Sequence, residues 1–473
     1  MAFNSLAFVA FFLIVTVVFF ILPHKFRWAL LLAASCFFYM YFIPVYILIL
    51  GFTIVVDYFA GIYIAKSEGR KRRMFLVFSL IANIGVLAFF KYYNFLNDNI
   101  TILLGDFGYK NQIPYLSILL PIGLSFHTFQ AMSYTIEVYR RHQKVEKHFG
   151  IYALYVMFYP QLVSGPIERP QNILHQFHEK KYFEYERVVD GLRLMLWGFI
   201  KKLVIADRLA IYVDAVFNNV QYHSGISMLL ASIFFGFQIY CDFSGYSEIA
   251  IGAAKVMGYD LMTNFRRPVL NSKSMRELWQ RWHISLSTWF RDYLYFPLGG
   301  NKKGQWITIR NVIIVFLLSG LWHGANWTFV IWGLLNGLLI SLETLLNPIL
   351  RKIHKLLGST ANFFRCITIF FFFTLTFIFF RAASFPDAWY MVKSIFTLKP
   401  GGIYKGEPPT AFGYSIFALV FLILVEHMQE YYPNFKIIHN NNVIVRYTGY
   451  VLLLLLLLSI GVFNGGQFIY FQF

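Results

Sequence analysis

Charged residues are scarce in this sequence. Asp, Glu, Lys and Arg make up 14% of its 473 residues, whereas about a quarter is typical of a soluble domain. The remainder is strongly apolar, with 58% hydrophobic residues and 54 Phe. These residues form repeated runs of spanning length with short loops between them, so the sequence predicts an all-α polytopic membrane protein. The runs favour helices over a β-barrel and leave no room for a soluble domain of any size.

Cysteine is also rare, and its spacing fits neither a disulfide framework nor a metal site. Cys36, Cys241 and Cys366 each lie in apolar surroundings, so we assign them to packing. The sequence has no phosphate-binding glycine loop, no Walker motif and no zinc-ligand spacing. We therefore expect no metal and no resident cofactor.

Acidic residues are outnumbered by basic ones, 23 to 41, which gives a net charge of +18. In a soluble protein this excess would favour nucleic-acid binding. Here the basic residues lie mostly in short loops between apolar runs, as expected for loops that face the cytoplasm and anionic lipid. We expect contacts with membrane lipid and no nucleic-acid partner.

The apolar runs predict about ten to twelve transmembrane or re-entrant helices. No internal repeat is visible, which argues against an inverted-repeat transporter. The first run has no basic residue before Lys25, so we interpret it as a retained helix and not as a cleavable signal. The predicted spans are 3–22, 28–43, 45–65, 74–96, 113–136, 149–165, 188–206, 226–256, 307–345 (long enough for two), 363–380, 411–430 and 443–463.

Loop charge predicts the orientation of the chain. The loops at 66–73 and 140–144 are both rich in Lys and Arg, and both fall on one side of the membrane if the N-terminus is outside. The loop between them, at 97–112, is nearly balanced in charge. The positive-inside rule therefore places the N-terminus outside.

The segment 260–310 mixes basic and aromatic residues. At helical spacing, five apolar side chains form one stripe, and the pattern alone favours a helix lying in the membrane interface. His283 lies within this segment, beside tryptophans, and by itself it would be an interfacial residue. The stripe consists of Trp279, Trp282, Leu286, Trp289 and Tyr293.

Polar residues inside apolar runs are costly, and one group lies at 319–326. On a continuous helix, Ser319, His323 and Asn326 would share one face. A buried imidazole stays neutral near pH 7, so His323 could act as a general base on a hydroxyl, with Asn326 orienting it or donating to an oxyanion. The chemistry alone leaves a packed core histidine equally open.

A second polar group, Asp242 and Glu248, lies inside one apolar run. Two carboxylates there could serve acid–base chemistry or ion transport. They are six residues apart, however, and would face one another only if Gly245 broke the helix. We favour a structural role, in which they pair with basic residues elsewhere. The other ten histidines are interpreted as loop, edge or packing residues.

Several segments in order resemble the membrane-bound O-acyltransferase family, and within it the alginate O-acetyltransferase type. They include the Arg-Trp-His motif at 281–283 and the Trp-His-Gly motif at 322–324. The full set is 159–170, 242–252, 264–268, 279–300, 319–329 and the ending 468–473. The resemblance implies one domain over residues 1–473, folded as a helical ring with a central tunnel. Its parts are N-terminal helices (1–148), a catalytic core (149–345) and C-terminal helices (346–473).

The resemblance also implies an activity. His323 matches the family's catalytic histidine and His283 its second histidine, and Asn326 joins them in the predicted site. The donor is a cytoplasmic thioester, either acetyl-CoA or an acylated carrier protein, and the acetyl group reaches an extracellular polysaccharide such as alginate from a bacterial inner membrane. A periplasmic serine-type acetyltransferase is the expected partner. Supporting or tunnel residues are Ser319, Trp322, Asp242, Glu248, Trp282 and Arg281.

Three other functions stay open at this point. One is D-alanyl transfer to teichoic acid, by the related branch of the family. Another is a transporter or channel that performs no acyl transfer. The third is a catalytically silent scaffold of an export complex, which predicts that His323 can be replaced without effect.

Overall fold

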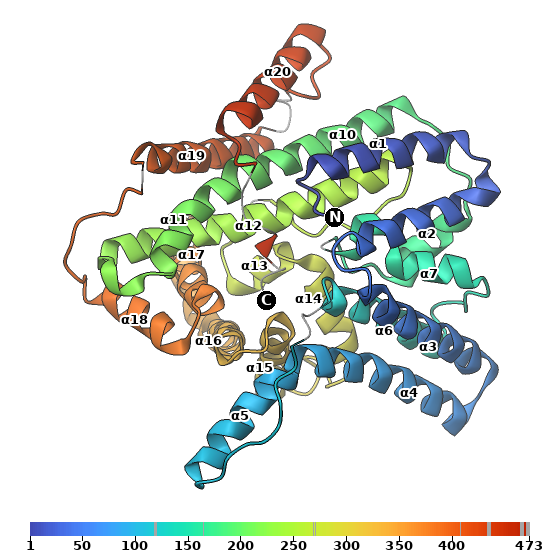
Figure 1. Ribbon diagram of the computed structural model, residues 1–473. Coiled ribbons are helices and arrows are strands. Elements are labelled where there is room, and N and C mark those ends of the chain that lie inside the picture. Colours follow the sequence, from blue (N-terminus) through green and yellow to red (C-terminus); the bar gives the residue numbers. More distant parts are fainter. Residues whose placement is uncertain are drawn as a thin grey trace. The chain divides into compact units, whose positions relative to one another are not determined.

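A computed structural model describes residues 1–117, 121–163, 165–267, 269, 271–406, 408–432, 437–463 and 468–469. Within these ranges the chain forms helices and no strands, which confirms the predicted all-α class (Figure 1). The first helices are α1 (Leu6–Ile21), α2 (His24–Met40), α3 (Tyr46–Lys66), α4 (Gly69–Leu87), η1 (Ala88–Tyr92), α5 (Tyr93–Asp106), α6 (Leu124–Arg140), α7 (Phe149–Met157), α8 (Tyr159–Leu162), α9 (Pro170–Ile173), η2 (Leu174–His178) and α10 (Tyr185–Phe199). They are followed by η3 (Ile200–Ala206), α11 (Asp207–Phe217), η4 (Val220–Tyr222), α12 (Gly225–Val256), α13 (Met275–Arg281), α14 (Ile284–Phe290), η5 (Arg291–Tyr295), α15 (Gln305–His323), α16 (Trp327–Leu357), α17 (Ser359–Arg381), α18 (Phe385–Phe396), α19 (Thr410–Tyr431) and α20 (Val443–Ile460).

Contacts group the chain into two compact units. The first unit consists of residues 1–195 and 247–262, and the second of residues 196–246 and 263–473. Residues 225–246 of α12 belong to the second unit, and residues 247–256 of the same helix belong to the first unit. The predicted tunnel and the division of the domain at residues 148 and 345 stay predictions.

Eight helices in the described part of the chain are long and apolar enough to cross a membrane. They are α3, the continuous rod from α4 through η1 to α5, α12, α15, α16, α17, α19 and α20. The chain is therefore a multi-pass membrane protein. The run at 307–345 does hold two helices, as its length indicated. The other predicted spans fall on shorter helices, namely α1, α2, α6, α7 with α8, and α10 with η3.

Several predicted spans have the wrong bounds. The span expected at 74–96 continues through η1 and α5 to Asp106, so most of the loop expected at 97–112 is helical, and the second helix of the run at 307–345 continues to Leu357. The helix expected at 113–136 begins only at Leu124, because Pro121 cannot donate a helical hydrogen bond and Gly123 takes a left-handed conformation with φ of 77°. The run at 149–165 is interrupted after Met157, just before Pro160. In the segments 113–136 and 149–165 the apolar runs predicted that helices form, and proline and glycine decided where those helices start and stop.

Polar side chains join three helices of the first unit. Asp57 of α3 accepts hydrogen bonds from Ser79 Oγ at 2.6 Å and from Asn83 Nδ2 at 2.8 Å, both on α4. Ser79 Oγ also lies 3.1 Å from Thr135 Oγ1 of α6. Hydrogen bonds of this kind hold transmembrane helices together where lipid removes the usual hydrophobic drive for association.

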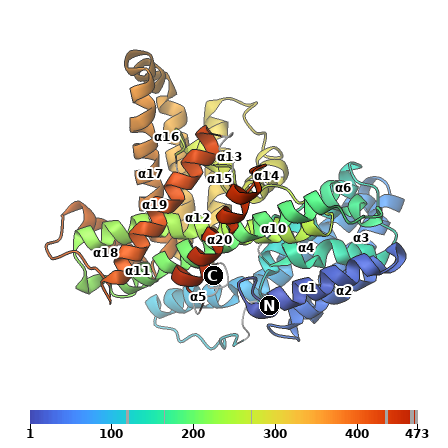
Figure 2. The ribbon, with the colours of Figure 1, turned by 90° about the horizontal axis from the view of Figure 1, so that it is seen from above.

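Glycines bring α15 and α16 together in the second unit. A Cβ atom added at Gly320 of α15 would run into the carbonyl of Phe329, and one added at Gly333 of α16 would run into the carbonyl of Phe316. The two helices therefore approach at backbone distance, as small residues allow in membrane proteins. The next helix, α17, runs beside α16 (Figure 2). This hairpin carries His323 at its turn.

Substituting Gly320 with Ala should destabilise the hairpin. The added methyl group meets backbone, which cannot move aside cheaply, so we expect a loss of about 1–3 kcal/mol. Gly413→Ala in α19 is the matched control, because a Cβ there has nothing within 4 Å; it should be neutral or slightly stabilising. The apparent unfolding temperature in detergent compares the two variants, and equal temperatures would contradict the close approach.

Candidate functional site

His323 is the last residue of α15, at the turn of the α15–α16 hairpin. Its side chain is 4% exposed. The helix stops there because Gly324 has an extended backbone and Asn326 begins the next helix. At Gly324 a Cβ would collide with the ring of Phe329, so the turn requires glycine next to the histidine.

The predicted common face of Ser319, His323 and Asn326 is wrong. Ser319 and His323 lie one turn apart on α15 and are both buried, whereas Asn326 lies beyond the end of that helix. Asn326 caps α16, its Oδ1 accepting the N–H of Thr328 at 3.0 Å. An asparagine before an apolar run is a common helix start, a signal that the helical-face interpretation overlooked.

Aromatic rings enclose His323. The rings of Trp322, Trp332 and Phe380 lie with their centroids 4.9, 5.0 and 5.2 Å from the imidazole, all edge to face. Trp332 belongs to α16 and Phe380 to α17. The side chain thus sits among apolar rings that exclude water, which strengthens any electrostatic interaction made there.

His283 lies in a break between α13 and α14. Its backbone is left-handed, with φ of 44°, an uncommon conformation for a residue other than glycine that costs of the order of 1–3 kcal/mol. Asn264 supports the break, because its carbonyl accepts the N–H of Ile284 at 2.9 Å and its Oδ1 accepts the N–H of Ser285 at 3.2 Å. The continuous stripe predicted from Trp279 to Tyr293 is therefore wrong.

The hydrogen bonds of Asn264 define the proton position on His283. The atom that faces Ser285 N–H must be an acceptor, so it is Oδ1, and the same Oδ1 lies 3.2 Å from His283 Nδ1. His283 Nδ1 must then carry the hydrogen, which leaves the lone pair on Nε2. The side chain is 1% exposed, and burial lowers the pKa of His283 to about 3. It is a neutral imidazole with an acceptor at Nε2.

Trp322 brings the two histidines to one place. Its ring centroid is 6.1 Å from that of His283 and 4.9 Å from that of His323. Two histidines that are 40 residues apart in sequence therefore both lie near the ring of Trp322, within the second unit. The sequence marked each histidine separately, and only the fold unites them.

His283 should make the protein less stable in acid. Its pKa is about 3 in the folded chain and 6.5 unperturbed, so between these values the unfolded chain binds more protons and stability falls as the pH is lowered. The loss should be about 2 kcal/mol at pH 5. His283→Asn, which tolerates the left-handed backbone, should remove this part of the pH dependence of unfolding, and the exposed His354→Asn should not. An identical pH profile for wild type and His283→Asn would contradict the assignment.

Asp242 is neutralised by a lysine, in line with the pairing predicted for it. Lys202 Nζ lies 2.6 Å from Asp242 Oδ1 and 2.8 Å from Asp207 Oδ1, and all three side chains are at most 4% exposed. Lys202 belongs to η3, a π-helical stretch of the kind that often accompanies functional sites. Gly245 of α12 permits the approach, since a Cβ there would lie 2.8 Å from the carbonyl of Gly198.

Glu248 and Asp242 do not share one face of α12. The helix α12 continues unbroken through Gly245, so the condition under which Asp242 and Glu248 would face one another is not met. Glu248 belongs to the first unit and Asp242 to the second.

The end of the chain reaches the same region. The N–H of Ile469 donates to Asp242 Oδ2 at 2.8 Å. The ring of Phe468 stacks on Tyr246 at 4.3 Å and lies 5.8 Å from Phe243, which in turn lies 4.5 Å from His283. The ending 468–473 carried only a family resemblance in the sequence, and its last four residues lie outside the described part.

Trp282 and Arg281 support the loop that holds His283. Trp282 is 2% exposed and packs on Phe265 and Phe373 at 5.4 Å each, so it is a core residue and not an interfacial anchor. Arg281 forms an ion pair with Glu277, with Nη2 and Oε1 2.8 Å apart, and its Nη1 donates a hydrogen bond to the carbonyl of Arg267 at 2.7 Å. Both side chains fix the segment around Asn264.

Sequence reasoning missed several residues of this site. Asn264 stood in a recognised segment without a role, and nothing in the spacing linked Lys202 to Asp242, 40 residues away. Trp332 and Phe380 were indistinguishable from other aromatic residues in apolar runs. Across the ranges that the structure describes, no group of three or more His, Cys, Asp or Glu side chains is placed to hold a metal ion.

Residues 140–385, which include both histidines, match the model of the membrane-bound O-acyltransferase family, MBOAT. The peptidoglycan O-acetyltransferase of Helicobacter pylori is 34% identical over 392 residues, covering 77% of this chain and 73% of that protein. The probable alginate O-acetylase AlgI of Pseudomonas aeruginosa is 34% identical over 430 residues, covering 90% and 80%. The teichoic acid D-alanyltransferase of Bacillus subtilis is 29% identical over 234 residues, covering 46% and 58%. Similarity to the two O-acetyltransferases thus extends over most of the chain.

Proposed function

Because the chain belongs to the membrane-bound O-acyltransferase family, we propose that it passes acetyl groups from a cytoplasmic thioester across the membrane for O-acetylation of a polysaccharide outside the cytoplasm. The observation that carries this proposal is the pair of buried histidines, His283 and His323, whose rings both lie near that of Trp322. Alginate is the acceptor that we favour, since the AlgI relative covers 90% of the chain. Peptidoglycan is supported by the Helicobacter pylori relative.

His323 is the proposed general base. It takes the proton of the acceptor hydroxyl as the hydroxyl oxygen attacks the carbonyl carbon of the thioester. The C–S bond of the tetrahedral intermediate then breaks, and the departing thiolate receives the proton from His323. The products are an oxygen ester and a free thiol, and no other reactant is needed.

His283 and Asn326 have supporting parts in this proposal. With its hydrogen on Nδ1, His283 can accept an N–H or O–H group of a substrate at Nε2. Asn326 uses Oδ1 to cap α16, so its Nδ2 is the atom that would donate to the oxyanion. Ser319, Trp322, Trp282, Arg281 and Asp242 position these groups.

The donor, partners and orientation belong to the same proposal. The donor is acetyl-CoA or an acylated carrier protein that docks on the basic, aromatic segment 260–310. A periplasmic serine-type acetyltransferase receives the acetyl group and modifies the polymer. The basic loops at 66–73 and 140–144 support an N-terminus outside a bacterial inner membrane.

Ester analysis of extracellular polymers tests the function. Mass spectrometry of cells with and without this protein should show acetyl esters that depend on it. D-alanyl esters that depend on it would instead support the alternative that the Bacillus subtilis relative represents. Unchanged esters of both kinds would contradict acyl transfer and favour the transporter or scaffold.

A further inference from the structure

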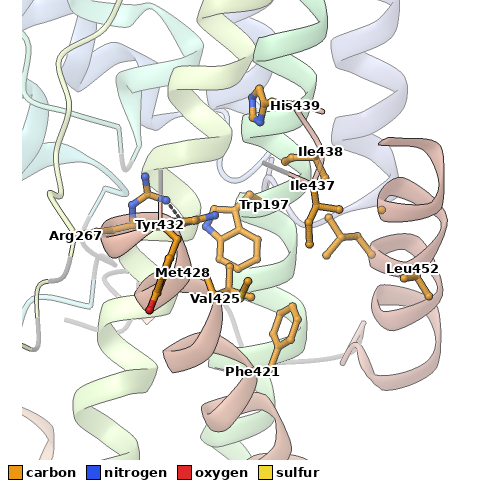
Figure 3. A pocket seen from close by; sticks show the side chains of 13 residues that line it. Trp197, Arg267, Phe421, Val425, Met428, Tyr432, Ile437, Ile438, His439 and Leu452 are labelled. Carbon is orange, nitrogen blue, oxygen red and sulfur yellow. Dashed lines mark hydrogen bonds between the residues drawn. The ribbon is translucent and has the colours of Figure 1, made fainter. Parts of the chain in front are cut away.

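A cavity of about 530 Å³ opens between α19 and α20 in the second unit, and neither His283 nor His323 lines it (Figure 3). On α19 its lining residues are spaced so that they share one face, and the same is true on α20. The α19 residues are Phe421, Val425, Met428 and Gln429, and the α20 residues are Gly449, Leu452 and Leu453. The remaining wall is formed by Trp197, Arg267, Tyr432, Ile437, Ile438 and His439.

The apolar part of this cavity lies between two membrane-spanning helices. The most hydrophobic windows of α19 and α20 have mean hydropathies of 1.9 and 2.2, and only 22% and 6% of them are buried against protein. Leu452, on the cavity face of α20, is 60% exposed. A crevice between such helices faces hydrocarbon, so the occupant of its inner part must be apolar.

The polar part of the cavity carries positive charge. Figure 3 shows Arg267 beside Tyr432 and Met428 at the end of α19, with Phe421 at the end of the cavity opposite His439. Arg267 donates to Gln429 Oε1, and among the described residues no carboxylate forms an ion pair with it. None of the lining residues is acidic. Arg267, beside the end of α19, could bind the phosphate group of a lipid whose acyl chain fills the apolar crevice.

We propose that this cavity binds one anionic phospholipid, with an acyl chain between α19 and α20 and the phosphate on Arg267. Tyr432 is exposed and lies beside Arg267 (Figure 3), as aromatic residues do at a membrane interface, whereas Trp197 is a buried part of the cavity wall. Arg267 follows Asn264 by three residues and its carbonyl accepts from Arg281, so the site adjoins the segment that supports His283.

Native mass spectrometry of the full chain in neutral detergent tests the site. Palmitoyl-oleoyl phosphatidylglycerol should be retained with at least about tenfold lower Kd than the matching phosphatidylcholine, equivalent to about 1.4 kcal/mol. Arg267→Gln should abolish this preference. Arg266→Gln is the matched control, since Arg266 is an exposed neighbour outside the cavity, and it should keep the preference.

A second variant blocks the apolar part of the cavity and leaves its charge unchanged. A Cβ at Gly449 would lie 2.6 Å from Ile437 Cγ2, so Gly449→Leu should fill the cavity and lose the retained lipid. Equal retention of both lipids by wild type, or retention unchanged in both Arg267→Gln and Gly449→Leu, would overturn the proposal. Displacement of the lipid by millimolar inorganic phosphate alone would also overturn it, because the site would then recognise a free anion.

Discussion

A His323→Ala variant is expected to leave the extracellular polymer without acetyl esters. General-base catalysis typically contributes 10²–10⁴-fold to a rate, and the loss of the imidazole also opens a gap among Trp322, Trp332 and Phe380. The ester content per sugar, measured by mass spectrometry, should fall at least about 100-fold. The chain should still be present in the membrane at the wild-type level.

Two control variants separate chemistry from folding. His323→Gln retains polarity and much of the volume but cannot accept and return a proton in the same way, so it should be as inactive as Ala. His354→Ala changes an exposed histidine and should leave the esters unchanged. Normal ester content in His323→Ala, at normal expression, would support the silent scaffold.

Substituting Lys202 with Met should cause the largest loss of stability. The change leaves Asp207 and Asp242 buried without the cation that both contact. Removing one partner of a buried ion pair typically costs about 3–5 kcal/mol, because the remaining charge is uncompensated. The apparent unfolding temperature in detergent should fall sharply, and little folded protein should be recovered.

A double variant tests the electrostatic cause. Adding Asp242→Asn to Lys202→Met removes one of the two stranded charges, so part of the stability should return. Lys302→Met, at an exposed position, should have no effect. If Lys202→Met unfolded at the wild-type temperature, the buried cluster could not be what holds η3 against α12.

The sequence predicted the fold class and the family better than the geometry of the site. A helix that crosses the bilayer needs a long apolar run, so the sequence alone predicted the spans that became α12, α15, α16, α17, α19 and α20. The break at His283 was not, because it depends on Asn264, 19 residues earlier, accepting from Ile284 and Ser285. No local pattern reports such a contact.

Two further errors have the same origin. Asn326 was placed on the face of His323, because helical spacing was extended across Gly324, where the chain turns. Lys202 was missed as the partner of Asp242, because pairing between distant helices leaves no trace in spacing. The residues alone marked His323, the resemblance joined His283 to it as a second histidine of the site, and the fold placed the ring of Trp322 near both.

Transfer of label from thioester to ester in membrane vesicles tests the central claim most directly. Inside-out vesicles that enclose periplasmic extract and the acceptor polysaccharide would receive acetyl-labelled CoA together with cytosolic extract, so that either form of thioester donor and an acceptor hydroxyl are present. Alkali-labile esters would then be counted on the enclosed polysaccharide. The buried histidine pair predicts labelled ester with the wild-type chain and with His354→Ala, and none with His323→Ala. Ester formed by His323→Ala at the wild-type rate would contradict it.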